Sequence, residues 1–201
     1  MTWRAISSRP YRKVTVDGMV STFAGDGTAG FQDGPGATAR FNALTGVAVD
    51  ARGNVFVSDC GNHRVRQITP DSVVSTLAGS GQAGFGDGQG TDAHFYDPMG
   101  IAVDSQGDIF VADFQNHRIR RVSPQGEVTT IAGSGAAVSF ADAPTGPGTQ
   151  EAFFRYPSGI AVDREGNVFV SDNGNRSIRK MTLGGPVTTL AGGGGGGSDG
   201  F

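Results

Sequence analysis

The sequence is poor in the features that define several common classes of protein. Only one of its 201 residues is a cysteine, so the chain cannot form an internal disulfide, and nothing in it indicates an oxidising compartment. Charged residues make up 17% of the chain, and the formal net charge is −3. This composition excludes a highly charged disordered tail, and it lacks the excess of positive charge that phosphate binding requires.

Long hydrophobic runs are also missing. No stretch reaches the roughly 18 apolar residues that a membrane-spanning helix needs, and no membrane partner is expected. The first ten residues lack the apolar centre of a signal peptide. We therefore leave the compartment unassigned: the cytoplasm is the default, and an extracellular location stays open for a truncated chain.

Glycine is abundant, with 34 residues, and it belongs to an internal repeat. The motif Gly-Val-Ala-Val-Asp at residues 46–50 returns as Gly-Ile-Ala-Val-Asp at 100–104 and 159–163. Each copy continues with a motif such as Asn-Val-Phe-Val-Ser-Asp at 54–59, and closes on one such as Thr-Leu-Ala-Gly at 76–79. A further closing motif, Thr-Phe-Ala-Gly, lies near the start. The chain therefore holds three full units and the last half of a fourth.

Each unit predicts four short β-strands. Val47 and Val49 follow the two-residue period of a strand, and Ala48 between them is apolar too, so we expect both faces of each sheet to be covered. The repeated phenylalanines Phe56, Phe110 and Phe169 are predicted to be buried between neighbouring sheets. Turns between the strands carry Asp and Asn side chains that bond local backbone groups. These structural repeat positions are Asp50, Asp59, Asn62, Asp104, Asp113, Asn116, Asp163, Asp172 and Asn175.

Four-stranded sheets that repeat at this period, each apolar on both faces, are typical of propeller blades. The sequence therefore predicts an all-β fold, an incomplete β-propeller of four-stranded antiparallel blades in an open arc of about three and a half blades. We expect an N-terminal tail or strand remnant at 1–10 and a Gly-rich tail at 193–201 that opens a further interblade loop. Between them lie the predicted blades: a partial one at 11–25, then 46–79, 100–133 and 159–192.

The motifs Pro-x-Gly-Ile-Ala-Val-Asp, Gly-Asn-Val-Phe-Val-Ser-Asp, Asn-x-x-Ile-Arg and Val-Thr-Thr-Leu-Ala-Gly resemble the NHL repeat family over residues 8–201. Leu44 departs from the pattern, since Pro98 and Pro157 stand at the equivalent positions. The resemblance implies a propeller of about six blades that binds proteins, peptides, glycans or RNA. Three and a half blades cannot close such a ring, so we expect a fragment or a chain that associates through its exposed end blades.

The predicted topology places the long interblade loops, 26–45, 80–97 and 134–156, on one face with the second turn of each blade. Long loops are often functional, and residues that break the repeat are the better candidates for binding. The candidate partner-binding residues are Phe31, Asp33, Phe85, Asp87, Phe114, Gln115, Phe140, Asp142 and Asn173. The structural alternative is that these loops only shape turns, with Phe41, Phe95 and Phe154 filling the gaps between blades.

Catalytic and metal-binding patterns are weak. His63 and His117 occupy equivalent positions beside a turn and are expected at the surface, and no histidine has the spacing of a zinc site. Asp33 and Asp87 offer too few carboxylates for a calcium loop. Cys60 has no basic partner that would activate it. We therefore predict no catalytic residue, no cofactor and no metal.

One arginine recurs in each unit, at Arg12, Arg66, Arg120 and Arg179. A stripe of arginines suits RNA, but aspartates recur as regularly, which favours pairing within the protein. The sequence thus favours a non-catalytic scaffold that uses the face of the long loops to bind a protein, peptide or glycan. Two alternatives stay open: a six-bladed metal-dependent hydrolase or lyase with ligands in missing blades, and an RNA-binding propeller.

Overall fold

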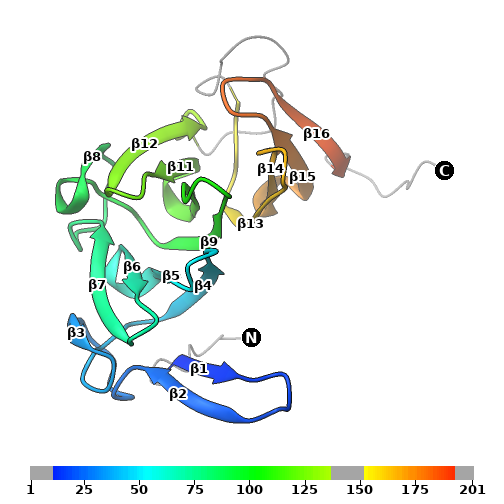
Figure 1. The fold of residues 1–201 in the computed structure, drawn as a ribbon. Coiled ribbons are helices and arrows are strands. Elements are labelled where there is room, and N and C mark those ends of the chain that lie inside the picture. The colour runs from blue at the N-terminus through cyan, green and yellow to red at the C-terminus, as the bar shows by residue number, and fades with distance from the viewer. Residues whose placement is uncertain (1–10, 137–151, 193–201) are drawn as a thin grey trace, which may run out of the picture.

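The computed structural model describes residues 11–136 and 152–192. Their strands form four antiparallel sheets that follow one another around an arc, which is open on one side (Figure 1). The all-β fold and the incomplete propeller predicted from the sequence are confirmed. The expected tails, 1–10 and 193–201, lie outside the described residues, as do Phe140 and Asp142.

The arc begins with a half blade and continues with three full blades. The half blade pairs β1 (Tyr11–Val14) with β2 (Val20–Ala24). The first full blade contains β4 (Leu44–Val49), β5 (Val55–Asp59), β6 (Arg64–Ile68) and β7 (Val73–Ala78). The second contains β9 (Pro98–Val103), β10 (Ile109–Asp113), β11 (Arg118–Val122) and β12 (Glu127–Ala132). The third contains β13 (Pro157–Val162), β14 (Val168–Asp172), β15 (Ser177–Met181) and β16 (Val187–Gly192).

Two interblade segments add a short fifth strand that the sequence did not predict. The strand β3 (Gly34–Pro35) pairs with the outer strand β7, and β8 (Gly88–Gln89) pairs with β12. The fourth strand of a blade would otherwise have an open edge, and two residues of the interblade segment before the blade are enough to pair with it. Proline is tolerated in β3 because an edge strand can leave one backbone side without a hydrogen bond.

Short 3₁₀ turns join the second and third strands of each full blade: η1 (Cys60–Asn62), η3 (Phe114–Asn116) and η4 (Asn173–Asn175). A further 3₁₀ turn, η2 (Gly90–Asp92), follows β8. The residue after each joining turn is left-handed, with φ between 52° and 54° at His63, His117 and Arg176. No helix among the described residues is long and apolar enough to cross a membrane.

The hydrophobic core lies between blades. Phe95 has no exposed surface and packs in one cluster with Val65 and Ala78 of the preceding blade, while Phe154 does the same beside Ile119. Burial of such a side chain stabilises the fold by about 1.5–3 kcal/mol. The expected filling of interblade gaps by the recurring phenylalanines is therefore observed, and a blade needs its neighbour to bury its face.

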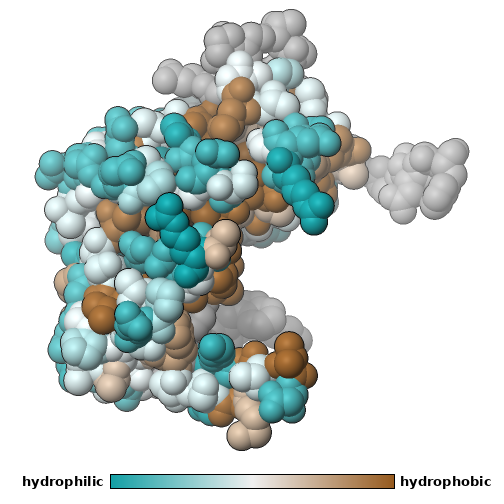
Figure 2. All heavy atoms as spheres, viewed as in Figure 1, coloured by the Kyte–Doolittle hydropathy of each residue, from teal (hydrophilic) through white to brown (hydrophobic). Residues whose placement is uncertain are grey.

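The innermost strands approach each other closely. A Cβ atom added at Gly100 of β9 would lie 2.5 Å from the backbone oxygen of Ser158 in β13, and one at Gly46 would meet the backbone oxygen of Met99. Glycine at these positions therefore lets neighbouring blades converge. Hydrophobic surface runs along the inner side of the arc (Figure 2). In the innermost strand β4, Val47 and Val49 are about half exposed.

Both ends of the arc expose residues that are buried inside it. On the last blade Ile178 is 40% exposed and Leu190 is 53% exposed, whereas Ile119, the equivalent of Ile178, is fully buried. A hollow of about 420 Å³ lies on this blade, lined by Ile178 and Ala191 among others. On the half blade Val14 and Val20 are 64% and 53% exposed.

Candidate functional site

The joining turns and the interblade segments lie on one face of the arc, as the topology predicts. The Gly61 backbone N–H donates to the Asn42 carbonyl at 2.9 Å, and the Asn62 amide donates to the Gly30 carbonyl at 2.8 Å. The second blade repeats this contact between Asn116 and Gly84 at 2.7 Å. We call this surface the loop face; its described residues are 26–45, 80–97 and 152–156 together with the turns at 60–63, 114–117 and 173–176.

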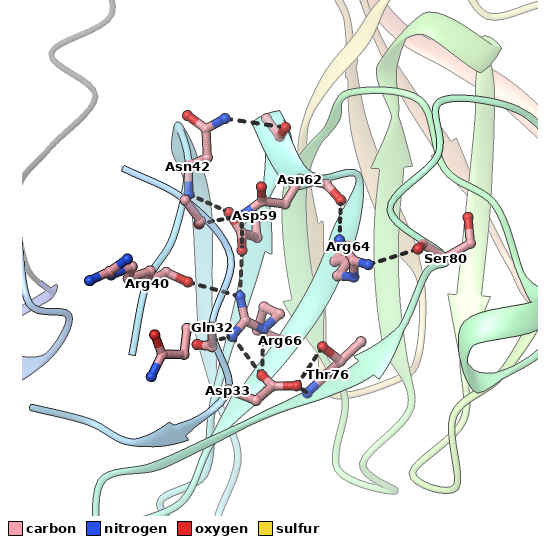
Figure 3. A network of polar contacts seen from close by, with 12 residues as sticks. Gln32, Asp33, Arg40, Asn42, Asp59, Asn62, Arg64, Arg66, Thr76 and Ser80 are labelled. Carbon is pink, nitrogen blue, oxygen red and sulfur yellow. Dashed lines mark hydrogen bonds and ion pairs between the residues drawn. The ribbon is translucent and has the colours of Figure 1, made fainter. Parts of the chain in front are cut away.

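A buried arginine, Arg66, links the segments that form the loop face. Arg66 has no exposed surface, and its guanidinium donates to Asp59 at 2.6 Å and to Asp33 at 2.6 Å (Figure 3). It also donates to the backbone carbonyls of Gln32 and Arg40. Strand β6, the end of β5 and the interblade segment are thereby joined by one side chain. We call this arrangement the arginine clamp.

The arginine clamp is repeated in the other full blades. Arg120 contacts Asp113 at 2.7 Å and Arg179 contacts Asp172 at 3.0 Å, and all four side chains are fully buried. Burial is the main influence on the pKa of Asp113 and raises it; Arg120 and the Asn116 amide act in the opposite direction. These pairs are internal, as the matching recurrence of Arg and Asp suggests, and the three buried arginines cannot reach an external ligand.

The candidate residues Asp33 and Asp87 also make contacts within the blade. One carboxylate oxygen of Asp33 accepts hydrogen bonds from the backbone N–H and the hydroxyl of Thr76, at 3.0 and 2.9 Å. Asp87 accepts the backbone N–H and the hydroxyl of Thr130 on its two carboxylate oxygens, at 3.1 and 3.0 Å, and also pairs with Arg120. Their carboxylates therefore link the interblade segment to the outer strand, although each side chain stays partly exposed.

The candidates Phe31 and Phe85 are exposed aromatic rings supported by arginine. The Arg64 guanidinium lies 3.9 Å from the centre of the Phe31 ring, and Arg118 lies 3.8 Å from that of Phe85. Such cation–π contacts contribute about 0.5–1 kcal/mol at exposed sites. Each phenylalanine is nearly half exposed, at 47% and 49%, so each presents an aromatic side chain held by arginine to solvent.

The candidate Phe114 belongs to an aromatic group at the seam between the second and third blades. Its ring centre lies 5.0 Å from that of Tyr156, which in turn lies 4.6 Å from His117. The Tyr156 backbone is left-handed, with φ of 52°, a conformation that is rare for a bulky residue. We call Phe114, His117 and Tyr156 the seam cluster. The exposed side chains of Arg155 and Arg176 belong to the same face.

The sequence reasoning missed Tyr156 and Arg155. A signal was present, because Ala43 and Asp97 stand at the positions equivalent to Tyr156, and Asn42 and Tyr96 at those equivalent to Arg155. These positions break the repeat as clearly as Phe114 does. They were overlooked because they immediately precede the first strand, where the neighbouring phenylalanine is strictly repeated.

The histidines beside the turns lie between blades instead of at the open surface. The Nδ1 atom of His117 accepts the Tyr156 backbone N–H at 3.0 Å, and His63 accepts that of Asp97 at 3.2 Å. The left-handed backbone of each histidine turns its ring toward the next blade. Burial lowers the pKa of His117, and the nearby charges of Arg155 and Arg118 lower it further.

The remaining candidates differ in exposure. Asn173 is exposed at the start of η4, and Gln115 is half-buried, with its backbone N–H bonded to the Tyr96 carbonyl at 3.1 Å. Phe140 and Asp142 lie outside the described residues, so their positions on the loop face stay predictions.

No group of three His, Cys, Asp or Glu side chains in the described ranges could hold a metal ion. Burial, together with the charges of Asp97 and Asp59, raises the pKa of the Cys60 thiol to about 12. A thiol with such a pKa is protonated and a poor nucleophile.

The sequence pattern of the NHL repeat matches the chain at residues 41–68, 95–122 and 154–181. Each match begins at the phenylalanine that fills an interblade gap and ends with the third strand of a blade. The matched unit therefore contains the gap-filling residue, the buried Arg–Asp pair of the arginine clamp and the joining turn.

Two curated relatives are similar over part of the chain. Protein SUPPRESSOR OF QUENCHING 1, chloroplastic, from Arabidopsis thaliana is 37% identical over 94 residues, which are 46% of this chain and 9% of that protein. NHL repeat-containing protein 2 from Homo sapiens is 31% identical over 140 residues, 64% of this chain and 19% of the relative. The chain thus spans less than a fifth of the length of these relatives.

Solved structures share the fold. A structural genomics protein of unknown function from Bacteroides thetaiotaomicron has a TM-score of 0.68 and 25% identity, over 87% of this chain and 42% of that one. Virginiamycin B lyase from Staphylococcus aureus has a TM-score of 0.55 and 16% identity, over 89% and 47% of the two chains. Three matched repeats on this architecture show that the chain belongs to the NHL repeat family, as an incomplete β-propeller.

Proposed function

We propose that the chain is a non-catalytic segment of an NHL-repeat propeller that binds a protein, peptide or glycan partner through its loop face. The observation that supports this proposal is that the side chains on that face fall into two groups with different roles. The repeated polar residues are engaged within the blades, as in the arginine clamp. The exposed phenylalanines Phe31 and Phe85 recur at equivalent positions. By contrast, Phe114, Arg155 and Tyr156 differ from the residues at the equivalent positions of the other blades.

The seam cluster is the part of the loop face best suited to binding. Phe114 stands where the other blades have Cys60 and Asn173, and Tyr156 stands where they have Ala43 and Asp97. Because those blades form without aromatic side chains at these positions, blade folding does not require them. Rigid aromatic rings offer large contact areas at a low entropic cost, and arginine adds hydrogen bonds and charge.

Phe31, Phe85, Gln115 and Asn173 extend the proposed surface along the same face. The two phenylalanines are held over arginines and cannot easily collapse onto the blade. Asp33 and Asp87 support the surface from the side through their bonds to the outer strands. In this proposal the aspartates fix the loops, and the aromatic rings contact the partner.

A peptide selection tests the proposal. A phage-displayed peptide library is panned on the purified chain, and the enriched peptides are then measured on a double variant, Phe114→Ala with Arg155→Ala. The matched control is Arg52→Ala with Arg164→Ala, which removes two exposed arginines from turns between first and second strands. Loss of binding to the loop-face variant alone supports the proposal. Equal binding to all three proteins contradicts it.

An enzymatic alternative is motivated by the relatives. A probable peptidyl-alpha-hydroxyglycine alpha-amidating lyase from Caenorhabditis elegans is 28% identical over 39% of this chain. Catalytic metal ligands would then lie in parts of a longer protein. Stoichiometric divalent metal in that protein, measured by elemental analysis, would favour this alternative over a scaffold.

RNA binding is the second alternative, because the loop face carries exposed arginines near aromatic rings. Filter binding across a salt series separates it from the proposed scaffold. Retention of RNA at low salt that weakens steeply as salt rises would favour RNA binding. Absence of retention at low salt would remove it.

A further inference from the structure

A cavity of about 350 Å³ lies at the seam between the first and second full blades. It is lined by the turns between the first and second strands of these blades and by Phe56 and Gln67 of the first blade. These turns connect the ends of the strands that point away from the loop face, because the joining turns connect the other ends. The cavity has the size of pockets that hold small molecules, and we call it the Phe56 cavity.

The repeat is broken beside this cavity, at position 67. Each full blade pairs its repeated phenylalanine with one residue of the third strand. That residue is Gln67 opposite Phe56 in the first blade, whereas it is Arg121 in the second blade and Lys180 in the third. Two blades therefore place a cation beside the phenylalanine, and the first blade places a shorter, neutral amide there.

In the other blades the cation at this position contacts its surroundings. The Nζ atom of Lys180 lies 5.7 Å from the centre of the Phe169 ring, and its charge interacts with that of Asp163 in the turn. Arg121 forms an ion pair with Asp108, which follows the equivalent turn of the second blade. The position thus brings a cation to an aromatic ring and to an acidic residue at the turn.

Two carboxylates line the Phe56 cavity, one from each blade. Asp50 accepts the side-chain amide of Asn54 at 2.8 Å. One oxygen of Asp104 accepts two backbone N–H groups of its own turn. The other oxygen accepts no hydrogen bond from any described residue, because Asp108 stands at the position of Asn54 and has no amide to donate. The Gln67 side chain likewise forms no hydrogen bond within the described ranges.

The charges around the cavity favour a cationic ligand. Asp50 and Asp104 are partly buried, whereas Arg52, the one cationic residue among those that line the cavity, is exposed. Water and salt screen an exposed charge more strongly than a partly buried one. An anionic ligand would be repelled by two carboxylates, and a neutral ligand would gain hydrogen bonds without the attraction between charges.

We propose that the Phe56 cavity binds a small aliphatic amine, whose ammonium group takes the place that Arg121 and Lys180 fill in the other blades. Its N–H groups donate to the free carboxylate oxygen of Asp104 and to the side-chain carbonyl of Gln67. Its alkyl chain contacts the Phe56 side chain, and the ring attracts the charge. This site is separate from the loop face and does not depend on the function proposed for that face.

The test measures binding of cadaverine, a five-carbon diamine, to the whole chain. Isothermal titration calorimetry gives the dissociation constant, and two-dimensional amide spectra identify the residues that respond. The expected result is saturable binding that shifts the signals of residues 54–56, 67 and 104–107. The neutral pentanediol of the same length should bind at least about tenfold more weakly, since it lacks the charge. Equal binding of the diol, or signal shifts only at other residues, would contradict the proposal.

Two variants and a control examine the residues assigned to the site. Gln67→Lys supplies the cation from the chain itself, as in the third blade, and should weaken cadaverine binding at least about tenfold. Asp104→Asn removes the free anionic oxygen and should weaken binding at least about fivefold. The matched control Asp71→Asn removes the same charge at an exposed turn and should change the affinity by less than about twofold.

Three results with these proteins would overturn the proposal: no binding of cadaverine by the original chain, unchanged affinity in Gln67→Lys, or equal losses for Asp104→Asn and Asp71→Asn. Amide spectra show whether each variant keeps the fold. The comparison of Asp104→Asn with Asp71→Asn decides the question if Gln67→Lys does not fold.

Discussion

The guanidinium of Arg66 lies 2.6 Å from the carboxylate of Asp59, and neither side chain has any exposed surface. This contact explains why Arg and Asp recur with equal regularity in the sequence. The two residues lie on neighbouring strands, seven positions apart. An equivalent pair joins the second and third strands of each full blade. A charge that is buried in this way depends on its partner, because an unpaired buried charge is costly.

The arginine clamp should therefore be sensitive to loss of one partner. Asp113→Ala is expected to lower the free energy of unfolding by about 3–5 kcal/mol, since Arg120 would stay buried without its anion. Urea unfolding followed by circular dichroism measures the change. Asp71→Ala, at an exposed turn, is the matched control and should change stability by less than about 0.5 kcal/mol. Similar effects of the two substitutions would show that the clamp is dispensable.

Glycine between the innermost strands gives a second prediction. Gly100→Ala should destabilise the chain by about 1–3 kcal/mol, because its Cβ atom would meet the Ser158 backbone. Gly159→Ala is the matched substitution on the last blade, where the nearest atom is the Ser171 side-chain hydroxyl at 3.0 Å, not a backbone atom. Thermal unfolding of both variants measures the difference. If Gly159→Ala lowers stability as much as Gly100→Ala does, close packing of neighbouring innermost strands is not the reason for glycine at position 100.

The repeats, the strands and the order of blades could be predicted from the sequence, because each depends on local motifs that recur in register. Exposure could not be assigned from the motif alone. Phe110 has no exposed surface, whereas its copy Phe169 on the last blade is only half-buried. Burial of one blade depends on the next blade, so identical motifs have different environments at the middle and at the end of the arc.

The candidate site was only partly predictable for a related reason. Phe114 was selected because it breaks the repeat, but its partner Tyr156 comes from the next blade and is far away in sequence. The joining turn and the segment before the first strand meet only after two blades have packed. Likewise, the pairing of β3 with β7 depends on an open sheet edge, which no property of Gly34 and Pro35 reveals.

The interblade histidine predicts a dependence of stability on pH. The folded pKa of His117 lies below its ordinary value of 6.5, because the ring is buried near Arg155 and Arg118, while Asp172 acts in the opposite direction. The unfolded chain therefore takes up a proton first as pH falls. The contribution of His117 to stability is complete above the unfolded pKa, and it is lost as pH falls through the folded pKa.

Urea midpoints measured from about pH 8 to about pH 5 check this dependence. The urea midpoint of the variant His117→Asn should decrease less in acid than that of the original chain. Asparagine tolerates a left-handed backbone and offers a neutral oxygen that accepts the Tyr156 N–H at every pH. An unchanged acid dependence in this variant would assign the effect to other groups.

The exposed ends of the arc predict concentration-dependent self-association. Ile178 and Leu190 on the last blade would favour contact with apolar surface on another molecule, such as Val14 and Val20 of the half blade. Sedimentation velocity across micromolar concentrations should show species larger than the monomer, and Ile178→Glu should reduce them. Val47→Glu, an exposed valine of the first full blade, is the control for added charge. A monomer at all concentrations would contradict this expectation.

The affinity of a selected peptide ligand for single variants of the seam cluster tests the proposed function most directly. We expect Phe114→Ala to raise the dissociation constant at least about tenfold, since central aromatic contacts carry most of the energy of an interface. Arg52→Ala lies in a turn between first and second strands. This variant should change the dissociation constant by less than about twofold, because substitutions outside an interface have little effect on affinity. An unchanged dissociation constant for Phe114→Ala, or an equal loss for Arg52→Ala, would contradict binding through the loop face.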